Sequence, residues 1–370
     1  MREISNDNAV KPSNSFGRLS LTPLNRRRLE NFKANKRALY SFWIFFILFM
    51  ISIMSNFIAN DKPLIISYEN DVLFPIFKAY PETRFGGIFE TEADYKDPFV
   101  KNLIDEKGWM IWPLISFSYD TINIQGDYRH PAPPSYENWL GTDDQGRDVV
   151  ARMVYGFRIS VLFGLALTIS SVIFGVTAGA VQGYFGGFVD LSLQRFVEVW
   201  ENLPQFYLLI IMSSFIVPGI FTIFFILALF SWIQLTPIVR AEFFRARNLD
   251  YVRAATALGV SHVVVMYRHL LPNAMVATLT MLPFLLTGSI VSLTSLDFLG
   301  FGLPPGEPSL GELLQQGRNN LGAPWLGITA IMTLGTMLTL LTFVGEGIRD
   351  AMDPRKSISP QNQSIKGAQK

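Results

Sequence analysis

"ISVLFGLALTISSVIFGVTAGAVQGY", residues 159–184, contains no charged side chain and is longer than the roughly 20 apolar residues that cross a bilayer as a helix. Gly, Ala and Ser recur along its length. Because no water is expelled when helices associate in lipid, close packing through small side chains holds such helices together. The stretch therefore predicts a membrane-spanning helix that is buried among neighbouring helices.

The composition of the whole chain also indicates a membrane protein. Of 370 residues, 49% are hydrophobic and 16% are charged, against roughly 25% charged in a typical globular chain. Mean hydropathy is +0.28. A net charge of +1 argues against bulk electrostatic binding to nucleic acid, which needs clustered cations. The chain has no cysteine, which excludes disulfides and thiolate metal sites. We predict a membrane-lipid environment, no cofactor and no nucleic-acid partner.

Toward the N-terminus the chain changes character twice. Residues 1–37 are polar and basic, and "ALYSFWIFFILFMISIMSNFIA" at 38–59 is long enough to span lipid. This run exceeds the roughly 7–15-residue apolar core of a cleaved signal peptide, and no A-x-A-like site follows it. Residues 60–146 are acidic and rich in proline and aromatic residues, and no stretch among them could span lipid. They predict a folded extramembrane insertion.

Two further predictions concern the insertion and the segment after it. The tryptophans of the insertion are expected to form a small core of its own; they are Trp109, Trp112 and Trp139. Apolar residues then recur at helical spacing, at Val150, Met153, Val154 and Phe157. This pattern predicts an amphipathic helix that lies at the membrane interface before the span at 159–184.

Toward the C-terminus more apolar stretches follow, each bounded by Gly, Pro or charge. Together with 38–59 and 159–184 they predict six spans, the others being 191–217, 221–239, 274–296 and 325–345. We therefore predict an all-α polytopic membrane protein with six transmembrane helices, five of them in a core at 147–348.

Basic residues in the loops predict the orientation. Lys and Arg are frequent in 1–37, in the loop 240–273 and in the tail 349–370, which the positive-inside rule places in the cytoplasm. The insertion and residues 300–324 would then lie outside.

"DYVRAATALGVSHVVVMYRHLLPN", residues 250–273, lies in that basic loop and resembles a helix-turn-helix. A recognition helix must offer polar side chains near its start, whereas residues 261–266 are mostly apolar and flanking spans would hold DNA at the bilayer. We instead predict a helix from Arg240 to Leu258 that ends at a left-handed Gly259. Ser261 would cap the next helix, and Pro272 would break it before the following span. The product is a bent docking element for a cytoplasmic partner.

The same stretch resembles the EAA loop of permease subunits of ABC importers, through "RAA" at 253–255, Gly259 and "LP" at 271–272. "NWLGTDDQGRDV" (138–149), "SLTSLDFLGFGLPP" (292–305), "SLGELL" (309–314) and "GEGIRDAMDPR" (345–355) resemble the oligopeptide, dipeptide and nickel permease branch. The resemblance runs in order from about residue 33 to 355. "FIANDKPLI" and the long insertion are most similar to the Yej-type (microcin C-type) peptide permeases. The leading Glu of the EAA pattern is Arg253 here.

This resemblance implies a type I importer permease fold in a bacterial inner membrane and a set of partners. They would be a second permease subunit in a heterodimer, two cytoplasmic ATPase subunits or one double-ATPase, and a periplasmic peptide-binding protein. It further implies that the coupling loop meets the ATPase through Arg253, Ala254, Ala255, Gly259, Leu271 and Pro272. The cargo would be an oligopeptide or peptide-like compound moved from periplasm to cytoplasm.

We predict that the chain is not an enzyme and that partner subunits hydrolyse ATP. No G-x-x-x-x-G-K-[ST] loop is present, and no Lys occurs between Lys107 and Lys356, so energy must come from another subunit or from an ion gradient. His130, His262 and His269 are scattered without metal-ligand spacing, which also favours peptide over nickel as cargo.

A gradient-driven secondary transporter of small polar solutes is the alternative function. Such transporters carry ionisable residues deep in their spans. Arg195, Glu198 and Glu201 share one helix face but lie near a span end, so we favour interfacial pairing. Polar residues on otherwise apolar spans are candidates to line a translocation pathway: Gln194, Gln234, Thr287, Ser289, Ser292 and Asp297.

Overall fold

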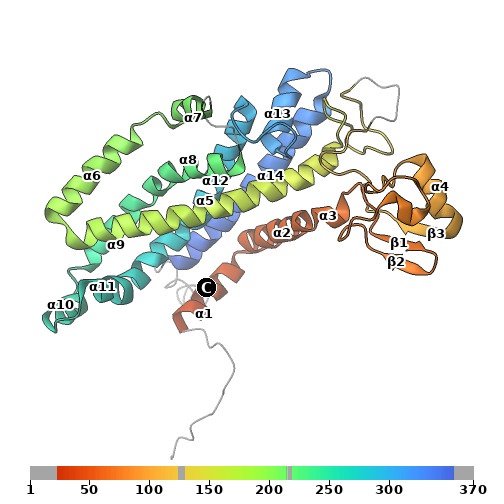
Figure 1. Ribbon diagram of the computed structural model, residues 1–370. Coiled ribbons are helices and arrows are strands. Elements are labelled where there is room, and N and C mark those ends of the chain that lie inside the picture. The colour runs from red at the N-terminus through yellow and green to blue at the C-terminus, as the bar shows by residue number, and fades with distance from the viewer. Residues whose placement is uncertain (1–22, 124–129, 214, 216–218, 354–370) are drawn as a thin grey trace, which may run out of the picture.

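The computed structural model describes residues 23–123, 130–213, 215 and 219–353, and Figure 1 shows a long helical bundle with a small mixed lobe at one end. Five helical stretches are long and apolar enough to cross a membrane: Lys36–Ile53, Val149–Phe185, Ile220–Ala246, His262–Leu299 and Pro324–Met352. The helices of the bundle are α1 (Pro23–Ala34), α2 (Lys36–Ile53), α3 (Ser55–Ile58), α5 (Val149–Phe185), α6 (Gly187–Glu201), α7 (Gln205–Ser213), α8 (Ile220–Ser231), η2 (Trp232–Gln234), α9 (Thr236–Ala246), α10 (Asp250–Ala257), α11 (His262–Val264), η3 (Val265–Leu270), α12 (Leu271–Leu299), α13 (Leu310–Asn319) and α14 (Pro324–Met352).

Helix α5 lies at the centre of the bundle, as its small residues predict. It packs most extensively against α9 and α12, and α14 packs against α12 and α2. A Cβ atom added to Gly179 would lie 2.6 Å from the carbonyl oxygen of Thr236, so only glycine allows α5 and α9 to approach this closely. The predicted burial of this span is confirmed.

Two of the predicted boundaries in the bundle are wrong. The interfacial helix expected around Val150 is the first part of α5, which runs unbroken for 37 residues from its cap at Asp148. The side chain of Asp148 accepts a hydrogen bond from the Ala151 amide at 2.8 Å, and the buried Val149 and Ala151 draw this turn into the bundle.

The predicted span at 191–217 is not one helix. It is divided into α6 and α7 at residues 202–204. Pro204 lacks an amide hydrogen and disfavours helical backbone at Leu203, which explains the break. In Figure 1, α6 and α7 follow one another along the side of the bundle, and neither belongs to the five described stretches that are long and apolar enough to cross a membrane.

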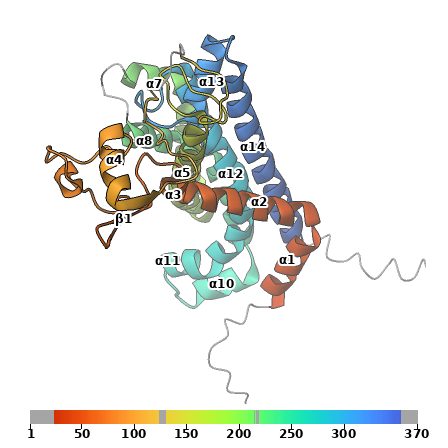
Figure 2. The same ribbon diagram turned by 90° about the vertical axis from the view of Figure 1, so that its right-hand side faces the viewer.

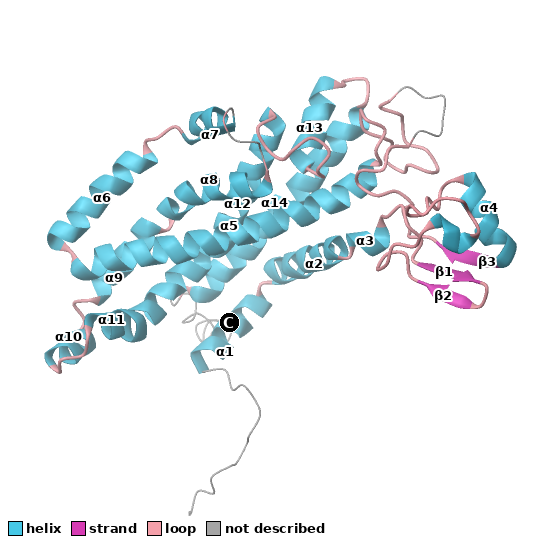
Figure 3. Cartoon of the chain, viewed as in Figure 1, coloured by secondary structure: helices cyan, strands magenta, loops and turns pink. Residues whose placement is uncertain are grey.

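The insertion folds around its own core and contains the strands of the described structure (Figure 3). β1 (Ile65–Tyr68) is the central strand and pairs antiparallel with β2 (Asp71–Leu73) and β3 (Gly108–Ile111). η1 (Glu82–Phe85) and α4 (Pro98–Lys107) cover the sheet. The core residues are Ile66, Tyr68, Leu73, Phe85, Ala93, Tyr95, Val100 and Ile104.

The tryptophan core predicted for this lobe is therefore wrong. Only Trp112 packs against the core, whereas Trp109 and Trp139 are each about half exposed. The core instead consists of aliphatic residues and the rings of Tyr68, Phe85 and Tyr95. These residues come from strands and turns that are too short to show a clear hydrophobic periodicity in the sequence.

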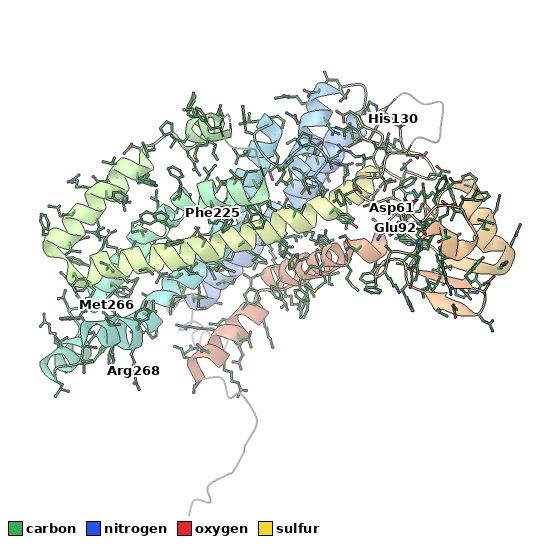
Figure 4. All side chains as sticks on the ribbon, viewed as in Figure 1. Asp61, Glu92, His130, Phe225, Met266 and Arg268 are labelled. Carbon is green, nitrogen blue, oxygen red and sulfur yellow. The ribbon has the colours of Figure 1, made fainter. Side chains whose placement is uncertain are left out.

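The two ends of the bundle differ in what they carry. Figures 1 and 2 show α1, α10 and the C-terminal end of α14 at one end, and α13, the start of α5 and the insertion at the other. In Figure 4, Met266 and Arg268 mark the first end, while Asp61, Glu92 and His130 mark the second. We call these the α10 end and the α13 end.

Lys96 joins the insertion to the bundle in an unusual way. Its Nζ lies 3.4 Å from the centroid of the Phe117 ring and is buried, and within the described residues it has no hydrogen-bond partner. Phe117 packs with Ala151 and Tyr155 of α5. Burial lowers the pKa of Lys96 to about 8 from 10.5, although carboxylates including Asp61 and Asp94 oppose the shift.

We expect Lys96→Met to stabilise the insertion at neutral pH. Because the folded pKa is depressed, the folded state carries the cost of a buried cation below about pH 8, and stability rises as pH increases from 8 toward 10.5. After discounting for partial exposure, the gain is about 1–2 kcal/mol at pH 7 and shrinks by pH 9.5. Thermal melts followed by tryptophan fluorescence at the two pH values would measure it. Lys101→Met, on the exposed face of α4, is the control, and an equal effect of both variants would contradict the argument.

Candidate functional site

The predicted docking element lies at the α10 end, but as two helices. α9 ends at Ala246, and α10 begins at Asp250 after an extended Leu249, so the single helix predicted from Arg240 to Leu258 is wrong. The Arg247 guanidinium stabilises the break because it donates to the carbonyl oxygens of Gly183 and Tyr184 at the end of α5, at 3.3 and 3.2 Å.

Gly259 has the predicted left-handed backbone, with φ of +78°. Its amide donates to the Thr256 carbonyl at 3.0 Å, and the Val260 amide donates to the Ala255 carbonyl at 3.2 Å, which closes the end of α10. A Cβ atom at Gly259 would meet nothing within 4 Å, so the backbone conformation, rather than space, calls for glycine here. Ser261 occupies the cap position of α11, but its side chain makes no capping hydrogen bond.

The two faces of α10 have different surroundings. Val252 and Ala255 are buried against Val265 and Leu270, so Ala255 belongs to the protein's own core. Arg253, Ala254 and Gly259 are exposed, as is Pro272, while Leu271 is half-buried.

Leu258, which sequence reasoning missed, is 84% exposed at the tip of the loop. It follows Ala254 by four residues and so shares its helix face, which was the available signal. We call Arg253, Ala254, Leu258 and Gly259 the coupling surface.

Pro272 does not break the helix. The chain continues from α11 through a π-helical stretch, η3, into α12, and these together form one stretch from His262 to Leu299. Pro272 has no amide hydrogen to donate, and the widened π turn immediately before it lets the helix continue without that hydrogen bond. Helix α12 therefore extends rigidly from the bundle to the docking element.

The α9 helix is also tied to α6. Arg240 donates to both carboxylate oxygens of Asp190, at 2.5 and 2.7 Å. Such a bidentate pair has a defined orientation, so a displacement of α9 would be passed on to the start of α6. The α10 end is thus connected to α5, α6 and α12.

At the α13 end the motifs at 138–149 and 309–314 meet in an ion cluster made of Asp143, Arg147, Arg152 and Glu312. Arg147 Nε donates to Asp143 Oδ2 at 2.7 Å, and its Nη2 reaches Glu312 Oε1 at 3.0 Å. Arg152 Nη2 donates to Glu312 Oε2 at 2.6 Å. Both arginines are at most 2% exposed.

Arg152 also holds loop backbone in place. Its guanidinium donates to the carbonyl oxygens of Tyr119, Gly306 and Glu307, at 3.2, 3.3 and 2.9 Å. The ion cluster therefore fixes the insertion, the start of α5 and the loop before α13 to one another. Tyr119 lies 33 residues before Arg152, whereas Gly306 and Glu307 lie 154 and 155 residues after it, a separation that nothing in the local sequence bridges.

Asp297, a pathway candidate, is 7% exposed at the end of α12. Its carboxylate accepts hydrogen bonds from the Leu303 amide at 2.7 Å and from the Ser309 hydroxyl. Ser309 in turn caps α13 by accepting from the Gly311 and Glu312 amides. In this structure Asp297 thus organises the loop between α12 and α13 rather than facing an open path.

The other pathway candidates are dispersed. Thr287, Ser289 and Ser292 lie on α12, whereas Gln194 is on α6 and Gln234 follows α8. Ser289 is buried, and the Thr287 hydroxyl donates to the Pro283 carbonyl at 2.8 Å. The single chain does not bring these five residues together.

Two of the three charged residues on α6 pair with each other, as expected, while their position at the membrane interface stays a prediction. Arg195 Nη1 donates to Glu198 Oε2 at 2.5 Å, and both side chains are exposed. Glu201 is exposed as well.

The chain matches, over residues 171–358, the family model described as binding-protein-dependent transport system inner membrane component. It therefore belongs to this family, whose members are the permease subunits of ABC importers. Within the family it is 54% identical to the peptidoglycan transport system permease protein YejE of Agrobacterium fabrum, over 94% of this chain and 96% of that one. It is also 54% identical to the inner membrane ABC transporter permease protein YejE of Escherichia coli, over 91% and 99%.

A more distant relative is also a permease protein of a peptide transport system. The oligopeptide transport system permease protein OppC of Bacillus subtilis is 31% identical over 66% of this chain and 79% of its own. A structure of the MetNI methionine ABC transporter in inward-facing conformations aligns with a TM-score of 0.45 at 16% identity, covering 55% of this chain and 96% of that chain.

Proposed function

We propose that this permease subunit moves oligopeptides or peptide-like compounds from the periplasm to the cytoplasm, driven by ATP that separate subunits hydrolyse. Relatives named for oligopeptide, dipeptide and peptidoglycan transport support this cargo class. The observation that carries the ATP-driven part is the coupling surface, because an exposed Leu258 beside a small Ala254 suits insertion into another protein.

The orientation follows from charge. Basic residues of α1, of the loop after α9 and of the end of α14 all lie at the α10 end, which supports a cytoplasmic position for both termini. The insertion and the ion cluster would then face the periplasm, where a peptide-binding protein delivers its cargo.

The partners complete what a single chain lacks. A second permease subunit would bring the dispersed polar residues Gln194, Gln234, Thr287, Ser289 and Ser292 to a shared pathway. Two ATPase subunits, or one double-ATPase, would bind the coupling surface. Arg253 would lie at the rim of that contact, with Leu271 and Pro272 behind it.

The mechanism follows from the connections of α10. Closure of the ATPase pair would displace α10, and Arg247, the Arg240–Asp190 pair and α12 would pass that displacement to α5, α6 and the bundle. Because packed helices move as rigid bodies, the spans would rock between inward- and outward-facing states.

Proteoliposomes that contain the assembled importer would test the energy source. With the binding protein outside, ATP inside and no ion gradient, we expect uptake of labelled oligopeptides that stops when ATP is left out. An imposed proton gradient without ATP should give no uptake. Uptake that depends on the gradient and not on ATP would support a secondary transporter instead. The structure gives that alternative little support at Arg195 and Glu198, because these two exposed side chains pair with each other.

A further inference from the structure

A pocket of about 820 Å³ lies at the α10 end, between α1, α9, α12 and α14. Figure 2 shows how α1 lies beside the end of α14 there. None of the coupling-surface residues or pathway candidates lines this pocket. It is therefore separate from the sites described above.

The lining of the pocket carries excess positive charge. Four arginines line it, Arg27, Arg28, Arg245 and Arg349, against the two carboxylates of Glu242 and Asp353. Glu242 is already engaged by Arg245 at 2.7 Å. Within the described chain neither Arg28 nor Arg349 forms an ion pair, and Arg28 reaches only the neutral Asn25 side chain at 3.4 Å. These two guanidinium groups are available to an anion.

Apolar residues make up part of the rest of the lining. Leu24 comes from α1, Val276 from α12 and Met352 from α14, and Leu249 lies in the turn between α9 and α10. A free inorganic anion gains nothing from such walls, whereas an amphiphile with an anionic head and hydrocarbon chains is complementary to both parts.

The helix ends that form the pocket are expected at the depth of the lipid headgroups. Its residues from α9 and α14 occupy the last turns of two membrane spans. The continuous helix from His262 to Leu299 would be roughly 57 Å long, against about 30 Å of bilayer hydrocarbon. Its first turns therefore project from the membrane, which places Asn273 and Thr280 near the boundary.

We propose that this pocket binds the phosphate headgroup of an anionic phospholipid from the leaflet at the α10 end. Arg28 and Arg349 donate to the phosphate oxygens, for which the guanidinium fork is well matched, and the acyl chains lie along Val276 and Leu249. The bound lipid bridges α1 and α14 and so anchors the N-terminal helix. Basic pockets between the ends of membrane helices are suited to this class of ligand.

Native mass spectrometry of the full-length protein, delipidated and then titrated with phosphatidylglycerol, would test the proposal. We expect one tightly held lipid in the wild type and binding that is roughly 30-fold weaker in the Arg28→Gln/Arg349→Gln double variant, from about 1 kcal/mol per arginine. Arg26→Gln/Arg195→Gln removes the same charge from two exposed ion pairs outside the pocket and should bind like the wild type. Arg28→Lys/Arg349→Lys should retain most of the binding.

Three results would overturn the proposal. The first is equal affinity of Arg28→Gln/Arg349→Gln and Arg26→Gln/Arg195→Gln for phosphatidylglycerol. Binding by Arg28→Lys/Arg349→Lys shows in the same experiment that substitution at these two positions leaves the fold intact. The second is equal binding of phosphatidylcholine, which would remove the role of headgroup charge. The third is displacement of the lipid by millimolar inorganic phosphate, which would make this a site for a free anion.

Discussion

Replacing Leu258 by Glu should detach the ATPase subunits from this permease and abolish ATP-driven uptake. The leucine is 84% exposed and so is available to a groove of the partner. The substitution would bury an unpaired carboxylate in that groove, which is energetically costly. An apolar anchor at the centre of an interface contributes about 2 kcal/mol or more, so the affinity for the ATPase should fall by about 30-fold or more and less ATPase should co-purify.

The chain offers a matched control for this experiment. Leu321, in the turn between α13 and α14 at the opposite end, is also 84% exposed. Leu321→Glu should leave ATPase recovery unchanged, and Ala254→Glu, on the same face as Leu258, should reproduce the loss. If ATPase is recovered equally with Leu258→Glu and Leu321→Glu, α10 is not the docking site.

The second large effect is expected from Arg152→Met. The substitution removes donors from Glu312 and from three backbone carbonyls. It leaves the buried Asp143 and the partly buried Glu312 with only Arg147 between them. Removing one partner from a buried ion network costs about 3–5 kcal/mol. We expect the apparent melting temperature in detergent to fall by on the order of 10 °C.

An exposed ion pair provides the control for the Arg152 variant. Arg195→Met breaks an ion pair whose arginine is 71% exposed and should change stability by less than about 0.5 kcal/mol. Arg152→Lys keeps the charge but loses the guanidinium fork and should fall between the wild type and the Met variant. Equal melting temperatures for Arg152→Met and Arg195→Met would show that the ion cluster does not hold the α13 end together.

Much of the bundle could be predicted because the signal for a membrane helix is local. The apolar length and small residues of 159–184 predicted both a span and its burial. The structure has a helix there that is long and apolar enough to span, and the close approach of α9 to Gly179 confirms the burial. The left-handed turn at Gly259 was predictable for the same reason, since a glycine after an alanine-rich helix marks its end.

Boundaries were less predictable because proline acts differently in different settings. Pro204 coincides with a break between α6 and α7, whereas Pro272 and Pro283 lie within α12. The π-helical stretch before Pro272 and the packing of Pro283 in the bundle maintain the helix, and neither is visible in the sequence.

The membrane class, the approximate spans, the insertion and the bent loop were predictable, because each depends on residues that are neighbours in the chain. The burial of Ala255 beside an exposed Leu258, and the meeting of Arg147 and Arg152 with Glu312 some 160 residues away, were visible only in the folded protein. Which side chains become neighbours depends on how the helices pack, and packing is a property of the assembled bundle rather than of any one segment.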